Sequence, residues 1–344
     1  MERAVFRLVV FLLPVVAGLP GLAAGVAEAP PSEESFYAKS LHYTNRGIES
    51  VYSKENGGLE RLTGVSAADL GCLKSKCHVR SCDACHRKDV GGKAFFTVEK
   101  DVLEAACRRC HPVEKDDPDV HFRKGMKCMD CHSAREVHGD GTAYESYRQP
   151  GVLDTRCERC HGDLPRIASH TVHGGRLDCA ACHARDVPTC YNCHIDTRLK
   201  EGKDASIEIK NLLFLVNHDG KVTPANFLSY VYGSKTMITF APSFAHSIRK
   251  EGRKCAECHD TPIVRDIKAD RLVPFRWEDG RIKSVEGVIP VLDGMRWDLV
   301  FLGREGDRWV PLRDPAAPLL NYSSRCSPLT REQFAEIEKA RTGA

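Results

Sequence analysis

Aromatic residues are scarce in this chain, making up only 7% of its 344 positions. Because aromatic side chains supply much of the buried area of an ordinary core, we expect something other than side chains to cover part of the apolar interior. After Pro30 there is no long apolar run, so no later segment is predicted to span a membrane. The charges nearly balance, with 50 Lys and Arg against 47 Asp and Glu, and binding to nucleic acid is therefore not predicted.

The first segment, Met1–Ala29, has the pattern of a secretory signal peptide. Arg3 and Arg7 precede an apolar run, Leu8–Ala24, and small residues follow it. The alternative is a membrane anchor, but Pro14 interrupts the run, which falls short of the roughly 20 clean apolar residues that a span needs. We therefore expect the signal peptide to be cleaved and the remaining protein to be periplasmic or extracellular and not membrane-spanning.

Cysteine, in contrast, is abundant, with 17 in the chain. All but Cys326, which is expected to be a buried thiol, belong to copies of the pattern Cys-x-x-Cys-His. One of these, Cys72–His78, is a variant with a longer spacing between Cys72 and Cys77. The seven regular copies contain the pairs Cys82 and Cys85, Cys107 and Cys110, Cys128 and Cys131, Cys157 and Cys160, Cys179 and Cys182, Cys190 and Cys193, and Cys255 and Cys258.

This pattern predicts covalent attachment of c-type haem. Two thiols three residues apart can each add to one vinyl group of the haem, and the next imidazole then meets the iron. A single copy would fit a zinc site or a redox dithiol as well, but zinc sites pair two ligand couples at wider spacing, and disulfide frameworks do not need the repeated histidine. We therefore expect eight haem c groups, or seven if the Cys72–His78 variant carries none.

The chain has 15 histidines, which can be sorted by position. Eight haems with two axial histidines each would need sixteen, so at least one would use Lys, Met, water or a ligand from another subunit; seven haems would need fourteen. The histidines of the motifs, expected as proximal ligands, are His78, His86, His111, His132, His161, His183, His194 and His259. The candidate distal ligands are His42, His121, His138, His170, His173, His218 and His246.

Three regions follow from these patterns: a signal peptide at 1–29, a multihaem array with seven motifs at 30–200, and a β-rich region with the eighth motif at 201–344. The predicted fold is organised by haem and mostly irregular, with short α-helices and a small β-rich C-terminal element. Ser206–Val216 and Leu228–Phe240 have the composition of strands, and Asp219-Gly220 predicts the turn between them. A final helix is expected at Thr330–Arg341, with Thr330 as its N-cap.

The motifs over Cys72–His259 resemble those of multihaem (octahaem) c-type cytochromes of anaerobic respiration. The segment Gly125–Gly141 carries the same resemblance, because His138 follows a motif by six residues, and such a histidine often serves as a distal ligand in that class. The resemblance implies haem attachment outside the cytoplasmic membrane. It also implies redox partners, such as a quinol oxidoreductase or other cytochromes.

Two classes of function remain open. In an electron carrier, two histidines saturate each iron and exclude substrate, so that electrons pass only between closely spaced haems. In an octahaem reductase, one iron keeps an open position at which an oxyanion such as nitrite, tetrathionate or selenite is reduced. The missing sixteenth histidine permits such an open position, but ligation by Lys or Met explains it equally well. The carrier is favoured. A third alternative is a subunit of an oligomer or an extracellular cytochrome filament.

Overall fold

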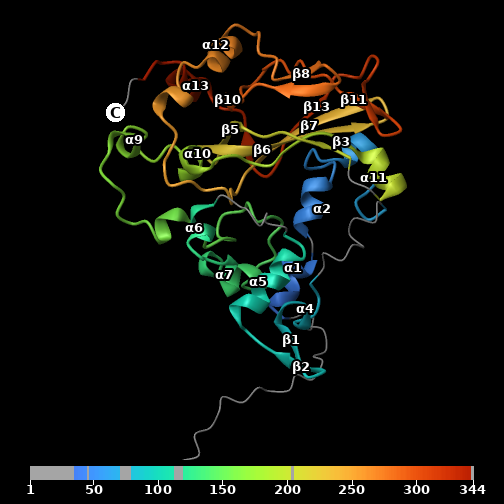
Figure 1. Cartoon of the computed structure of the whole chain (residues 1–344), viewed down its shortest axis with the longest axis vertical. Helices are drawn as coiled ribbons and strands as arrows, with labels where there is room; N and C mark the ends of the chain where they lie inside the picture. Colours follow the sequence, from blue (N-terminus) through green and yellow to red (C-terminus); the bar gives the residue numbers. More distant parts are fainter. Residues whose placement is uncertain (1–34, 45, 70–78, 112–118, 203–204, 342–344) are drawn as a thin grey trace, which may run out of the picture.

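The computed structural model describes residues 35–44, 46–69, 79–111, 119–202 and 205–341. The predicted signal peptide and the variant motif Cys72–His78 lie outside these residues. Figure 1 shows a twisted sheet flanked by α12 (Pro262–Lys268) and α13 (Arg331–Ile337), with a group of short helices on its other side. The hairpin of β1 (Arg87–Val90) and β2 (Lys93–Phe96) lies at the far end of that helical group.

Short helices dominate the first half of the described chain. None of those before the sheet exceeds the nine residues of α5. Two of them end at a glycine: Gly64 and Gly139 follow α3 and α8 and take positive φ angles of 71° and 81°. The helices of this half are η1 (Tyr37–Lys39), α1 (Leu41–Thr44), α2 (Arg46–Tyr52), α3 (Glu60–Thr63), α4 (Asp83–His86), α5 (Lys100–Arg108), α6 (Val120–Arg123), α7 (Cys128–Cys131), α8 (Ala134–His138), η3 (Cys157–Arg159), α9 (Ala168–Thr171) and α10 (Cys179–His183).

The second half is built on a mixed sheet of eight strands. The central strand β6 pairs with β5 and β7 in antiparallel fashion and with β3 in parallel, and this third partner makes the sheet branch. Parallel pairs of β10 with β5 and of β13 with β7 extend the sheet. Its strands are β3 (Thr189–His194), β4 (Ile207–Glu208), β5 (Leu212–His218), β6 (Lys221–Tyr232), β7 (Lys235–Pro242), β10 (Gly287–Pro290), β13 (Leu319–Tyr322) and β14 (Cys326–Ser327).

Four further strands form two antiparallel hairpins of their own, and two short helices complete this half. The hairpins are β8 (Phe275–Glu278) with β9 (Arg281–Ser284) and β11 (Leu302–Glu305) with β12 (Arg308–Pro311). The remaining helices are α11 (Ile195–Glu201) and η4 (Cys255–Glu257).

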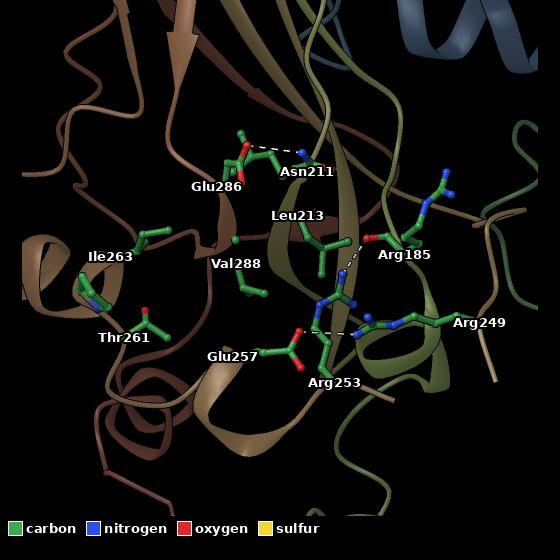
Figure 2. A pocket seen from close by; sticks show the side chains of 13 residues that line it. Arg185, Asn211, Leu213, Arg249, Arg253, Glu257, Thr261, Ile263, Glu286 and Val288 are labelled. Atoms are coloured by element: carbon green, nitrogen blue, oxygen red, sulfur yellow. Dashed lines mark hydrogen bonds and ion pairs between the residues drawn. The ribbon is translucent and has the colours of Figure 1, made fainter. Parts of the chain in front are cut away.

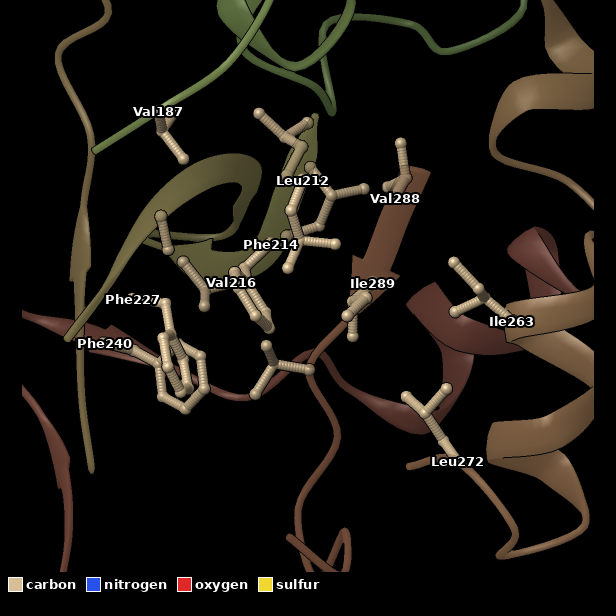
Figure 3. Packing of buried hydrophobic residues seen from close by; sticks show 14 of the residues in the cluster. Val187, Leu212, Phe214, Val216, Phe227, Phe240, Ile263, Leu272, Val288 and Ile289 are labelled. Atoms are coloured by element: carbon tan, nitrogen blue, oxygen red, sulfur yellow. The ribbon is translucent and has the colours of Figure 1, made fainter. Parts of the chain in front are cut away.

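Apolar residues of β5, β6 and β7 form the centre of the main core (Figure 3). The rings of Phe214 and Phe227 stack with centroids 4.8 Å apart, and Phe240 meets both edge-on. The predicted turn at Asp219-Gly220 joins β5 to β6, and both residues take the positive φ angles, 50° and 86°, that such a hairpin requires. The aromatic residues of this chain are therefore few but concentrated.

Thr330 caps α13 as predicted, because its side chain accepts a hydrogen bond from the backbone N–H of Gln333 and the Gln333 side chain bonds back. The sheet is larger than the small element expected from the sequence. It also takes in β3, which precedes the expected boundary at residue 200, because pairing with β6 and burial of Tyr191 draw this segment out of the array. Among the described residues, no helix has the length and apolar character needed to cross a bilayer.

Candidate functional site

Six of the seven regular copies fold into one helical turn each. In five of them, the histidine N–H donates a hydrogen bond of 2.9 Å to the carbonyl of the first cysteine. The sixth, Cys179–His183, is helix α10 itself. Positions i, i+3 and i+4 of a helix lie on one face, so each turn presents two thiols and one imidazole on the same side. The five histidines with this bond are His86, His111, His132, His161 and His259.

Each histidine of these six turns faces a second histidine from elsewhere in the chain. The ring centroids are 5.9 to 6.3 Å apart in the six pairs. A metal bound by two imidazole nitrogens at about 2 Å, with about 1.1 Å from each nitrogen to its ring centre, requires about 6 Å. The pairs are His86 with His138, His111 with His42, His132 with His246, His161 with His121, His183 with His170, and His259 with His173.

Hydrogen bonds to Nδ1 orient many of these rings. In five histidines, Nδ1 lies 2.9 to 3.1 Å from a backbone carbonyl oxygen. A carbonyl only accepts, so Nδ1 carries the proton and Nε2 keeps the lone pair that a metal needs. The contacts are His86 to Thr97, His170 to Pro165, His173 to Ser169, His183 to Arg249, and His259 to Glu336.

The buried carboxylate of Glu136 orients the ring of His132 in the same way, by accepting a hydrogen bond from its Nδ1, which is 2.9 Å from Glu136 Oε2. Burial raises the pKa of Glu136, but hydrogen bonds from the Thr155 backbone and from His132 outweigh it, so the pKa is lowered and the group stays ionised. Such a carboxylate fixes the tautomer of a ligating imidazole and raises its basicity.

Two of the distal candidates are held neutral. Burial, and then the neighbouring His111, lower the pKa of His42. Burial and then His86 do the same for His138. Neutral imidazole is the form that binds a metal, so the electrostatics of these pairs agree with their geometry.

The donor set fits haem c. The two thiols and the imidazole of each turn would hold a haem, and the facing histidine would be its second histidine ligand. The cysteines of the regular copies are not in disulfides. Within the described ranges, no three His, Cys, Asp or Glu side chains gather into a metal-binding cluster.

Consecutive turns lie beside one another. Burial raises the pKa of Cys85 and of Cys131, and the neighbouring thiols Cys107 and Cys160 raise these two pKa values further. Burial and then Cys182 likewise raise the pKa of Cys258 to about 12, so this late copy joins the array from a distant part of the chain.

The seventh regular copy, Cys190–His194, is different. It lies in β3, and the nearest ring to His194 is that of Trp309, with centroids 5.3 Å apart. His194 Nε2 donates a hydrogen bond of 2.7 Å to the Leu302 carbonyl. Among the residues that the structure describes, no second histidine ring is paired with His194.

The remaining candidates are not paired in the described part of the chain. His78 and the thiols of Cys72 and Cys77 lie outside it. His218 ends β5, where its Nε2 is buried and 3.8 Å from Asp219 Oδ2, facing no motif histidine. Cys326 is buried as predicted, and its Sγ is 3.5 Å from the Phe240 carbonyl.

A cavity of about 420 Å³ lies beside the turns of Cys179–His183 and Cys255–His259 (Figure 2). Three arginines and two glutamates, Glu257 and Glu286, line it together with apolar residues of β5 and β10. Arg253 donates to the Arg185 carbonyl at 2.8 Å, and Arg249 pairs with Glu257 at 3.7 Å. The buried Arg249 Nε has no hydrogen-bond partner among the described residues. Sequence reasoning missed this cavity, because its arginines gather only through folding.

The groups that orient the histidines were also missed. Backbone carbonyls carry no sequence signal at all. Glu136 does carry one, since Ser133 and Glu136 form a capping box at the start of α8, immediately after a motif.

No family model and no solved structure matches the chain. Among curated proteins, it is similar to the dissimilatory sulfite reductase MccA of Wolinella succinogenes, at 24% identity over 33% of this chain and 23% of that enzyme. The match therefore covers less than a quarter of that relative. The similarity is distant, and the relative is a redox enzyme.

Proposed function

We propose that this protein is a multihaem c-type cytochrome that carries electrons between redox partner proteins outside the cytoplasm. The observation that carries the proposal is the set of six histidine pairs, each joining a motif histidine to a distant one at 5.9 to 6.3 Å. Chance contacts would not pair six motif histidines with six different non-motif histidines at one distance.

The pairs favour a carrier over an enzyme. Two facing imidazoles fill both axial positions of an iron, and substrate then has no position at which to bind. When bound, haem c supplies one-electron redox chemistry. The role of the chain is to hold the imidazoles in place, as Glu136 and the backbone carbonyls do, and to keep neighbouring turns close enough for transfer between them.

A second candidate is a reductase of oxyanions. Two observations favour it: the distant similarity to a dissimilatory sulfite reductase, and the cavity, whose three arginines outnumber its two glutamates and could contact an anion. Against it, the motif histidines nearest the cavity, His183 and His259, both face a second histidine. If those histidine pairs each held a haem iron, neither iron would have a position free for an anion from the cavity.

The two candidates are separated by measuring the oxidation of the reduced holoprotein by sulfite, together with its electron paramagnetic resonance spectrum. A carrier is expected to show low-spin signals from at least six haems. It is also expected to show no oxidation by sulfite beyond that of a control sample that contains a reduced redox dye but no protein. Rapid catalytic oxidation by sulfite, with high-spin iron in the spectrum, would establish the reductase instead. A protein purified without covalent haem would contradict both.

A further inference from the structure

The copy Cys190–His194 has the same sequence pattern as the six paired copies but a different backbone. It is extended, pairing in parallel with β6 and antiparallel with β4. The His194 N–H donates to the Ala205 carbonyl at 2.8 Å instead of closing a turn onto Cys190. Asn192, with a φ of 60°, marks an irregularity in the strand between the two cysteines. The helical turn that gathers two thiols and an imidazole on one face is therefore missing here.

The residues inside this copy are buried and bound to one segment of the C-terminal half. Tyr191 and Asn192 are 0% exposed, whereas the corresponding positions of most other copies are at least partly exposed. The Tyr191 hydroxyl donates to the Val300 carbonyl at 2.6 Å. Asn192 exchanges two hydrogen bonds of 2.8 Å with the backbone of Leu302.

His194 takes part in the same contact. Its Nε2, the atom that would meet an iron, donates to the Leu302 carbonyl, which accepts from Asn192 as well. The ring is 6% exposed and packs against Trp309. A carbonyl oxygen 2.7 Å from Nε2 occupies the direction in which a metal would lie at about 2 Å. Haem does not fit this copy as it is folded.

We infer that Cys190–His194 is not a haem site but a structural joint: as strand β3 of the sheet, it fastens the start of the β11–β12 hairpin to the sheet through the backbone at 300–302. This inference rests on the proposed function, because it contrasts one copy with six that carry haem. It also agrees with the histidine count: the six regular turns use six motif histidines and six of the seven distal candidates, so that only His218 remains among the distal candidates and His194 needs no partner.

Trypsin supplies a direct test on the holoprotein, because cleavage after Arg176, Arg185 and Arg198 separates two neighbouring copies. Peptide 177–185 contains only Cys179 and Cys182, and peptide 186–198 contains only Cys190 and Cys193. By mass spectrometry, we expect haem on 177–185 and none on 186–198. Haem on 186–198 would overturn the inference and leave the proposed function standing. A bare 177–185 peptide, with no haem on the other paired copies, would instead overturn the proposed function.

Paired variants give a second test that does not depend on digestion. Cys190→Ala with Cys193→Ala is expected to leave the ratio of haem to protein unchanged. The matched control, Cys179→Ala with Cys182→Ala, is expected to lose one haem per chain. If the first double variant also loses one haem per chain, the copy is a haem site and the inference fails.

His194→Phe tests the joint itself. It keeps an aromatic ring against Trp309 but removes the donor to Leu302, so we expect a lower midpoint of thermal unfolding with an unchanged haem content and an unchanged low-spin spectrum. Loss of one low-spin signal in this variant would show that His194 binds iron.

Discussion

The array and the sheet of this protein are stabilised in different ways. Between residues 82 and 183, the only buried apolar side chains in the described part of the chain are Val152 and Ala181. The sheet, in contrast, buries Phe214, Phe227 and Phe240 completely, at 0% exposure each. The sheet thus has a core of its own side chains, whereas the array has almost none, and under the proposed function haem macrocycles at the paired histidines would supply the apolar surface that the array lacks.

The largest expected effect comes from withholding haem. If the protein is produced in a cytoplasm that does not attach haem, the array at 82–183 should lose its structure, because it has almost no core of its own. Strands β5, β6 and β7 should keep theirs. Hydrogen–deuterium exchange measures both regions in one sample, with the holoprotein as the control. Protected amides throughout the haem-free array would show that the array, like the sheet, keeps its structure without haem.

The converse change damages the sheet and spares the array. Phe227→Ala removes a fully buried ring from the centre of the core and should lower the free energy of unfolding by about 3–5 kcal/mol. The covalent haem content should not change. Leu320→Ala, at a side chain that is 39% exposed on β13, is the control and should cost about 1 kcal/mol or less. Chemical denaturation of the two variants gives the comparison, and equal losses would show that the core is not centred on Phe227.

A smaller, local effect is expected from His173→Ala. This variant removes the ring facing His259 at 6.2 Å and so opens one axial position. One haem should become high-spin and bind carbon monoxide, while the other five paired sites stay low-spin. Thr171→Ala, on the exposed side of α9, should leave the spectrum unchanged. Carbon monoxide binding that is the same in both variants would mean that His173 is not a ligand.

The smallest effect links the two regions. Thr330 caps α13, and the Glu336 carbonyl on that helix orients His259 through a contact of 2.9 Å. Thr330→Ala should therefore cost about 1 kcal/mol of stability and slightly shift the reduction potential of one haem. Thr330→Ser keeps the capping oxygen and should show neither change in a redox titration or a thermal melt. An unaltered potential in Thr330→Ala would show that the cap does not reach the His259 ring.

Local signals in the sequence were sufficient for several features. The Asp219-Gly220 turn and the Thr330 cap follow from the conformational preferences of a few adjacent residues, and both are present where they were predicted. The candidate distal histidines could be named because the motif histidines are recognisable and the others can be counted. Cys326 was correctly expected to be buried, since it has no place in any motif.

Only the tertiary structure decides which histidines meet. His132 faces His246 and His111 faces His42 across long stretches of chain, and no local pattern encodes such a distance. The tertiary structure also decides the conformation of Cys190–His194, whose sequence has the same motif as the other copies. Pairing with β6 and the hydrogen bonds to Leu302 make it a strand, because non-local hydrogen bonds and burial outweigh the local tendency of the pattern to form a turn. The sequence by itself determined a repeated motif, and folding determined which of its copies in the described chain form a helical turn that faces a second histidine.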